Sequence, residues 1–570
     1  MTPPAELAKS DPKSVTESVR NPTALEEVDG DNGRPAFMLT KTEIKLLGIA
    51  GIGFFLDAYD LFIINPVSTM LQYRLYGGNH LPTNLEGFMK AGANIGSVLG
   101  QFAFGYAADA FGRKAVYGKE LMLIIIATIL SLTVPTGSLS PDNCLIYLAV
   151  FRILLGIGVG GDYPMSASIT TDRANLRKRG TMLSYIFSNQ GWGSFVGSLA
   201  TVIVLLAYKK TMEAGNVSRV DGVWRILIGI SLVPAFGTLY QRLTLPESTR
   251  FKNSQKHHHH HDAEAQNDDD DLKKTQRAAE DSQAGITAEK RAQDEDKKSV
   301  DCDSAEVEES ESSEGPSIDD PTAEPETLVK KKAHFKEFVQ YFSEWEHAKM
   351  LIGTCMCWFL LDVAFYGINL NQNVVLQQIG YDGTDGSPWE RLFKVSTGNM
   401  IITALGFVPG YYATILTIEI LGRKFIQLQG FLAAALFLAI LAAKFHELNK
   451  ASFIVCFAFL QFFFNFGANS TTYCYPAEVF PTRFRAFAHG ISAAAGKAGA
   501  IISALAFNTL SKKIGTPAVL WIFFACCVAG AFFTLLLPEV KGRDPDLILM
   551  EEIKARREKL AAEAKGIQGA

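Results

Sequence analysis

The first feature of this 570-residue sequence is the scarcity of charge along most of its length. Charged residues make up 20% of the chain and collect in the tails and one central segment, while the stretches between hold long apolar runs. Runs of about 20 apolar residues are long enough to cross a bilayer. They argue against the several soluble domains that length alone would suggest. A net charge of −5 also lacks the basic excess typical of nucleic-acid binding.

Cysteine clusters, a signal peptide and catalytic groupings are missing too. The eight cysteines show no metal-ligand spacing and no disulfide framework. Most lie in or beside apolar runs, where cysteine is usually a small core residue. The N-terminus is polar and holds no signal peptide, so the first membrane helix is expected to direct insertion. No nucleophile–base pair or metal cluster indicates an enzyme, and we expect neither a cofactor nor a metal site.

Aromatic residues are absent between Phe251 and Phe335. The surrounding segment, 246–347, is dominated by Asp, Glu, Ser and Lys, and it cannot bury enough apolar surface to fold alone. We therefore expect an acidic disordered loop there and a disordered tail over 1–43. The five histidines of 257–261 could bind metal, but a low-complexity tract or an inserted tag explains them more simply.

The sequence does contain twelve apolar runs in a six-plus-six arrangement. They lie near 45–70, 86–108, 117–136, 144–170, 182–207, 224–245, 349–375, 392–418, 424–444, 451–475, 486–510 and 517–538. This predicts an all-α membrane protein with an N-terminal bundle over 44–245 and a C-terminal bundle over 348–540. Lys and Arg in short loops mark the cytosolic side. Both ends of the chain, including the tail over 541–570, and the central loop are therefore predicted to be cytosolic.

The two halves repeat one another, which indicates a duplicated six-helix unit. Asp109 and Glu419 precede a Gly-Arg-Lys motif at the same spacing, and Asp172 and Glu478 precede a pair of arginines at the same spacing. These motifs resemble the major facilitator superfamily, in which two helical bundles rock about a central site. The resemblance implies a cytosolic latch for the outward-open state, with helix capping and topology charge as the alternative. Its members would be Asp109, Arg113, Asp172, Glu419, Arg423, Glu478 and Arg483.

Ionisable residues inside the expected spans are a further signal, because a charge there costs about 2.5–3.5 kcal/mol on insertion scales. Among them are Asp57, Asp60, Glu120, Arg152, Asp162, Asp362 and Lys497. An Arg152–Glu120 pair could serve structure alone. Keeping the whole set for structure would be costly, so we expect most of these residues to take part in function.

The repeat relates some of these residues to one another. Asp57 and Asp362 lie 305 positions apart, close to the 306 between corresponding latch arginines. They are therefore expected to be counterparts that face the cavity between the bundles. Lys497 has no charged counterpart, since the same offset lands on Gly191, beside Gln190. This asymmetry favours an anionic substrate bound against the C-terminal bundle.

Longer strings resemble the plant and fungal proton-coupled phosphate symporters. They are GFFLDAYD at 53–60, GGDYP at 160–164, WFLLDVAFYGINLNQ at 358–372, and the residues from 465–469 through 480–483 to 496–499. The acidic loop favours the fungal branch. The resemblance implies a phosphate site made of Tyr163, Gln190, Trp358, Asp362, Tyr366, Asn469 and Lys497. It implies a proton route through Asp57, Glu120, Arg152 and Asp162.

The function expected from this resemblance is import of inorganic phosphate with protons, by alternating access, at the plasma membrane. The partners would be phosphate, protons, the lipid bilayer and cytosolic regulators of the central loop. A porter of glycerophosphodiesters or other organophosphates would need the same cation in a roomier pocket. A phosphate-sensing receptor would bind phosphate and signal with little flux. Acids retained inside the membrane favour transport, since a pure sensor does not need a proton route.

Overall fold

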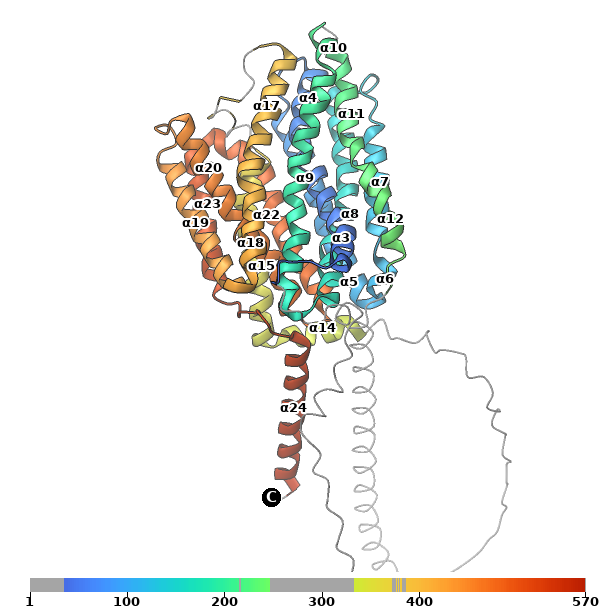
Figure 1. The fold of residues 1–570 in the computed structure, drawn as a ribbon, viewed down its shortest axis with the longest axis vertical. Helices are drawn as coiled ribbons and strands as arrows, with labels where there is room; N and C mark the ends of the chain where they lie inside the picture. Colours follow the sequence, from blue (N-terminus) through green and yellow to red (C-terminus); the bar gives the residue numbers. More distant parts are fainter. Residues whose placement is uncertain are drawn as a thin grey trace, which may run out of the picture. The chain divides into compact units, whose positions relative to one another are not determined.

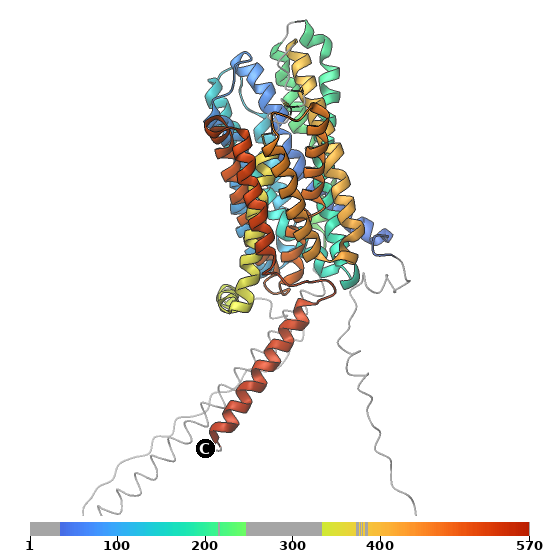
Figure 2. The ribbon, with the colours of Figure 1, turned by 90° about the vertical axis from the view of Figure 1, so that its left-hand side faces the viewer.

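The described part of the computed structural model comprises residues 35–214, 217–246, 333–371, 376, 378, 380–381 and 386–568. The expected N-terminal tail, acidic loop and histidine tract lie mostly outside these residues. The described residues form helices and connecting turns, with no β-strand among them. Helices of the two halves run roughly parallel, from blue to green in the first half and from yellow to red in the second (Figures 1 and 2).

Six spans come from the first half. They are α3 (Lys41–Phe62) continued by α4 (Ile64–Tyr76), α5 (Thr83–Phe111), α6 (Arg113–Val116) with α7 (Lys119–Leu132), α8 (Pro141–Arg173), α9 (Arg179–Ala207), and α11 (Val220–Ile230) with α12 (Leu232–Leu243). The first begins at a capping box, in which Thr40 and Glu43 satisfy each other's backbone N–H groups. The short α10 (Lys209–Glu213) follows α9.

The second half supplies six more spans. They are α15 (Trp345–Asn369), α17 (Pro388–Ile402) joined through η3 (Thr403–Phe407) to α18 (Val408–Leu421), α19 (Arg423–Ala443), α20 (Lys450–Asn465) with α21 (Ala468–Val479), α22 (Arg485–Ile514) and α23 (Thr516–Thr534). The connecting element η3 is a π-helical turn, a form common at functional sites. The tail ends in α24 (Pro545–Gln568).

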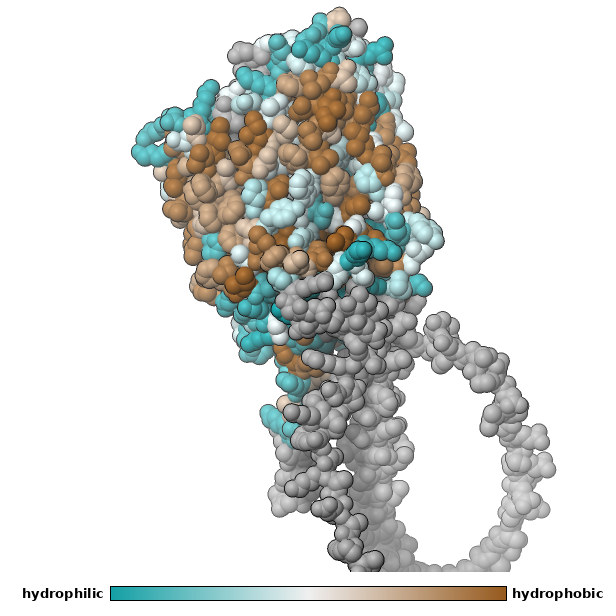
Figure 3. All heavy atoms as spheres, in the orientation of Figure 1, coloured by the Kyte–Doolittle hydropathy of each residue, from teal (hydrophilic) through white to brown (hydrophobic). Residues whose placement is uncertain are grey.

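Eleven of these spans are long and apolar enough to cross a membrane. The twelfth, α5, is 29 residues long but carries polar residues such as Lys90, Asn94 and Gln101. Those side chains are buried, because α5 packs between α8 of its own half and α22 of the other. The six-plus-six arrangement expected from the sequence is thus present. On the face of the bundle that Figure 3 shows, apolar residues dominate the middle and hydrophilic residues gather toward the ends.

The end of the segment expected to be a disordered loop is instead helical. Residues 333–343 form α14 (Ala333–Ser343), whose Phe338 is buried against Phe484 and Phe487 with ring centroids 6.0 and 4.7 Å apart. The reappearance of aromatic residues at Phe335 marks the point where the chain regains enough apolar surface to pack. The boundary of the acidic segment therefore lies earlier than expected from the sequence.

Glycine allows α5 and α8 to approach at backbone distance. A Cβ placed on Gly156 would lie 2.0 Å from the carbonyl oxygen of Ala93, and one on Gly96 would lie 1.9 Å from that of Ile153. Neither oxygen belongs to a flexible side chain that could move aside. Small residues are required wherever membrane helices cross this closely.

Gly156→Ala is therefore expected to destabilise the protein by about 1–3 kcal/mol through overpacking. Gly237→Ala is a matched control, because a Cβ there meets nothing within 4 Å. Thermal unfolding in detergent should show a lower Tm for Gly156→Ala and an unchanged or slightly higher Tm for Gly237→Ala. Equal Tm values would show that the α5–α8 crossing tolerates a side chain.

Candidate functional site

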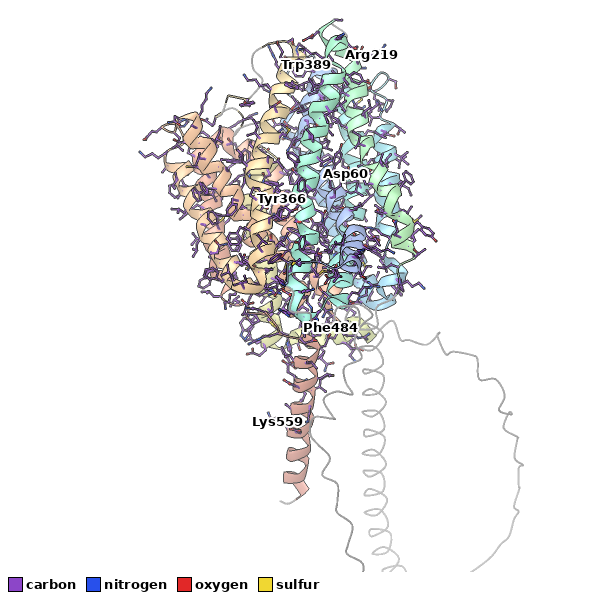
Figure 4. The ribbon with its side chains drawn as sticks, viewed as in Figure 1. Asp60, Arg219, Tyr366, Trp389, Phe484 and Lys559 are labelled. Atoms are coloured by element: carbon purple, nitrogen blue, oxygen red, sulfur yellow. The ribbon has the colours of Figure 1, made fainter. Side chains whose placement is uncertain are left out.

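The residues of the expected phosphate site meet at the middle of the bundle. Figure 4 shows Tyr366 and Asp60 near mid-height, with Trp389 toward one end and Phe484 toward the other. The site draws on α8 and α9 of the first half and on α15, α21 and α22 of the second. Every expected phosphate-site residue is at most 3% exposed. The structure thus brings together residues that lie up to 334 positions apart in the chain.

Lys497 is the only lysine or arginine among these residues. Its Nζ donates to the Tyr366 hydroxyl at 2.7 Å and lies 3.6 Å from Oδ2 of Asp362. It also sits 5.0 Å from the centroid of the Tyr163 ring, at cation–π distance. The ammonium is therefore compensated by one carboxylate, one hydroxyl and aromatic faces contributed by both halves.

Glycines beside Lys497 bring α22 against α15. A Cβ on Gly496 would lie 2.4 Å from Cδ1 of Trp358, and one on Gly499 would lie 2.4 Å from the carbonyl oxygen of Phe359. The short distance between the helices places Trp358 next to the site, with its ring centroid 6.2 Å from that of Tyr163. The Gly-Lys-Ala-Gly string is thus a packing motif as well as the carrier of the charge.

Gln190 and Asn469 are linked by a residue that sequence reasoning missed. The Tyr411 hydroxyl donates to Oε1 of Gln190 at 2.8 Å and accepts from Nδ2 of Asn469 at 2.8 Å. Tyr411 lies on α18 and is 1% exposed. It was missed because it is one of two adjacent tyrosines in an apolar span, and nothing in the local sequence separates them.

The acids of the first half gather around an arginine that was also missed. Arg242 on α12 lies 2.7 Å from Oδ1 of Asp162 and 3.1 Å from Oε1 of Glu120, and all three side chains are 0% exposed. Gly53 makes room for them, since a Cβ there would lie 1.7 Å from Asp162 Oδ2. Asp57 is buried on the adjacent α3, and neither of its carboxylate oxygens has a hydrogen-bond partner among the described residues.

The Arg152–Glu120 pair considered from the sequence is not formed among the described residues. Arg152 donates instead to the backbone carbonyls of Met89 at 3.1 Å and Asp60 at 3.1 Å. Arg242 takes the place beside Glu120. A count of every charge inside the expected spans would have found it, because Arg242 lies within 224–245. Its position just before the Pro-Glu motif makes it look like an ordinary charge at a helix end.

The motifs expected to form a latch adopt the same geometry in both halves. Arg113 pairs with Asp109 at 3.1 Å and Asp172 at 3.3 Å. Arg423 pairs with Glu419 at 2.8 Å and Glu478 at 2.7 Å. The glycine before each arginine has a positive φ, 93° at Gly112 and 83° at Gly422, which favours glycine at that position.

These motifs also join the two halves. Asp109 accepts from the backbone N–H of Phe487 at 2.8 Å, and Glu419 accepts from that of Thr181 at 3.0 Å. Arg485 forms an ion pair with Asp172. Arg483, the expected latch member, pairs with Glu337 of α14 at 2.9 Å.

Contacts between the halves exist at the opposite end as well. The Asn65 amide donates to the carbonyl of Asn369 at 3.0 Å, and the Trp389 indole donates to that of Leu205 at 2.7 Å. The two halves are thus in contact at both ends, and the residues between them are almost completely buried. This is an occluded arrangement, in which the central residues are closed off from both ends.

Asp172→Asn is expected to loosen the latch end of the bundle, because it leaves Arg113 and Arg485 short of a buried counter-charge. Cys474 is buried on α21, four residues before Glu478. Maleimide labelling of Cys474, followed by peptide mass spectrometry, should rise several-fold in the variant. Labelling of the buried Cys144 should stay unchanged. If Cys474 reacts no faster, the ion pair does not control access.

Comparison with known proteins agrees with this architecture. The model of the family described as "Sugar (and other) transporter" matches residues 46–551. An inorganic phosphate transporter of Saccharomyces cerevisiae is 38% identical over 544 residues, covering 92% of this chain and 86% of that protein. A repressible high-affinity phosphate permease of Neurospora crassa is 35% identical over 521 residues, covering 88% and 85%.

A solved structure shares the fold. The proton:xylose symporter XylE superposes with a TM-score of 0.62 at 19% sequence identity, covering 89% of this chain and 98% of that one. At that identity the likeness concerns the fold alone. The match to the family model, the identity with its relatives and the twelve-helix fold agree, and the chain therefore belongs to the sugar (and other) transporter family of the major facilitator superfamily, as a multi-pass membrane transporter and not an enzyme.

Proposed function

We propose that this transporter imports inorganic phosphate together with protons, by alternating access across the plasma membrane. The observation that carries the proposal is Lys497, a buried ammonium at the interface of the two halves, beside one carboxylate, Asp362, and several neutral hydrogen-bonding groups. The names of the similar fungal proteins agree with phosphate as the substrate. A sugar needs no such cation, whereas a phosphate anion does.

The phosphate site consists of Tyr163, Gln190, Trp358, Asp362, Tyr366, Asn469 and Lys497. Lys497 supplies the positive charge, and the Tyr, Trp, Gln and Asn side chains supply neutral donors for the phosphate oxygens. Asp362 lies 3.6 Å from the ammonium, so phosphate binding places an anion beside an anion. A proton on Asp362 or on the phosphate itself removes that repulsion, which couples entry of the two.

Protons pass through the acids of the first half. Asp57 is suited to carry one, because a buried carboxylate without a partner is costly to keep charged. Glu120 and Asp162 share the single guanidinium of Arg242, so this cluster holds one carboxylate more than its cation balances. Arg152 holds α3 and α5 through their carbonyls at the outer side of this route.

The two halves, 44–245 and 348–540, act as the moving bundles. Both ends of the chain face the cytosol, as does the acidic segment between the bundles, which is open to regulators. The latch of Asp109, Arg113, Asp172, Glu419, Arg423, Glu478 and Arg483 then closes the cytosolic end. Asn65 and Trp389 contribute to closure at the outer end.

Substrate competition tests the proposal. Labelled phosphate should enter cells that lack their own phosphate carriers and express this chain, and a tenfold excess of a glycerophosphodiester should not slow it. Strong competition together with uptake of the labelled diester would assign the site to organophosphates. Phosphate binding without saturable flux would identify a sensor.

A further inference from the structure

The hydroxyl of Tyr411 occupies the position between two amides from opposite halves. Gln190 belongs to α9 of the first half and Asn469 to α21 of the second, and Tyr411 hydrogen-bonds to both at 2.8 Å. Both amides belong to the proposed phosphate site. Tyr411 therefore accepts from the Asn469 amide as a phosphate oxygen would, and it donates to the Gln190 carbonyl as the P–OH group of a protonated phosphate would.

Two further features support a dedicated position for this ring. Tyr411 lies four residues after the π-helical turn η3. Such turns are rare within α-helices and occur frequently at functional sites. Its ring packs on Gly191, where a Cβ would lie 2.8 Å from Cδ2 of Tyr411. Gly191 is the repeat counterpart of Lys497. At the position where the second half carries the Lys497 ammonium, the first half has a glycine. The missing side chain leaves room for the Tyr411 ring.

We infer that Tyr411 is a positioning residue that stands in for substrate when the transporter closes unloaded. This inference rests on the proposed function. A symporter must return through a closed state without its substrate, and that state would bury the polar ends of Gln190 and Asn469. Buried polar groups are almost always hydrogen-bonded, and leaving them unpaired is costly. Tyr411 supplies the donor for Gln190 Oε1 and one of two acceptors for the Asn469 amide, whose Nδ2 also donates to Asn465 Oδ1 at 2.7 Å. Asp362 and Tyr366 satisfy Lys497 in the same way.

Tyr411→Phe keeps the ring and removes the hydroxyl. Net uptake of phosphate requires the unloaded return, whereas exchange of labelled for unlabelled phosphate proceeds with the site loaded in both directions. In liposomes containing the full chain, the rate of net uptake should fall about tenfold relative to the rate of exchange. A tenfold change corresponds to the free energy lost when one buried hydrogen-bonding group is left unpaired. Gly191→Ala, which crowds the ring without removing the hydroxyl, should shift the ratio in the same direction.

Tyr412→Phe is the matched control. Tyr412 is 39% exposed and accepts a hydrogen bond from the Trp192 indole at 3.3 Å, away from the site amides. Its ratio of net uptake to exchange should equal that of the wild type. A Tyr411→Phe variant in which both fluxes fall equally, or neither falls, would overturn the inference. Absence of any phosphate flux in the wild type would overturn the proposed function, and the inference with it.

Discussion

Lys497→Ala is expected to lower phosphate uptake by about a hundredfold or more. The side chain is 1% exposed, and it is the only cation among the proposed phosphate ligands. Removing one partner of a buried, hydrogen-bonded charge pair has effects of this size, because the other charge is left uncompensated. Initial rates of labelled phosphate uptake, corrected for the amount of protein in the membrane, measure the loss.

Controls separate substrate binding from folding. Lys513→Ala removes an exposed lysine from the end of the same helix and should leave uptake unchanged. Lys497→Ala combined with Asp362→Asn removes both charges of the pair, so thermal stability should recover while uptake remains lost. If the double variant transports phosphate at near wild-type rate, Lys497 is a structural charge and not the anion ligand.

Arg242→Met should cause a large loss of stability. Arg242 holds Asp162 and Glu120, and none of the three side chains is exposed. Leaving two buried carboxylates without a cation costs about 3–5 kcal/mol. We expect little folded protein in the membrane and a markedly lower Tm for what remains, measured by thermal unfolding in detergent.

A triple variant isolates the cause. Arg242→Met with Glu120→Gln and Asp162→Asn replaces the whole cluster by neutral groups, and it should regain much of the lost Tm without regaining proton-driven uptake. Arg219→Met, at an exposed position near the end of the bundle, is the control for losing an arginine (Figure 4). An Arg242→Met protein as stable as the wild type would contradict the importance given to this cluster.

The twelve spans could be predicted because each is a long apolar run and because the halves repeat. The repeat also predicts that Asp57 and Asp362 face a common interior, and both are 1% exposed. It could not predict where the helices break. The helices are interrupted at Ile63, at η3 and at Gly467. At Gly467 the backbone lies against Gly430 of α19, a tertiary contact, since a Cβ on Gly467 would lie 2.5 Å from Cα of Gly430.

Two residues of the site region were missed: Arg242 could have been found by counting every charge inside the spans, whereas only tertiary contacts reveal Tyr411. Arg242 looks like an ordinary charge at a helix end. Tyr411 does not stand out, because aromatic residues make up 11% of the chain. Their partners lie 80 residues or more away for Arg242 and 58 or more for Tyr411. Lys497, in contrast, could be predicted to matter from the sequence, because it stands alone in the middle of an apolar run.

Proton-driven accumulation of phosphate by the purified protein tests the central claim most directly. The full chain is reconstituted in liposomes, labelled phosphate is added outside, and the outside is made acidic. The account predicts accumulation above the outside concentration, its collapse when an uncoupler dissipates the gradient, and no accumulation with Lys497→Ala. The account would be contradicted if phosphate only equilibrated across the membrane, with a rate and a final level that do not depend on the proton gradient.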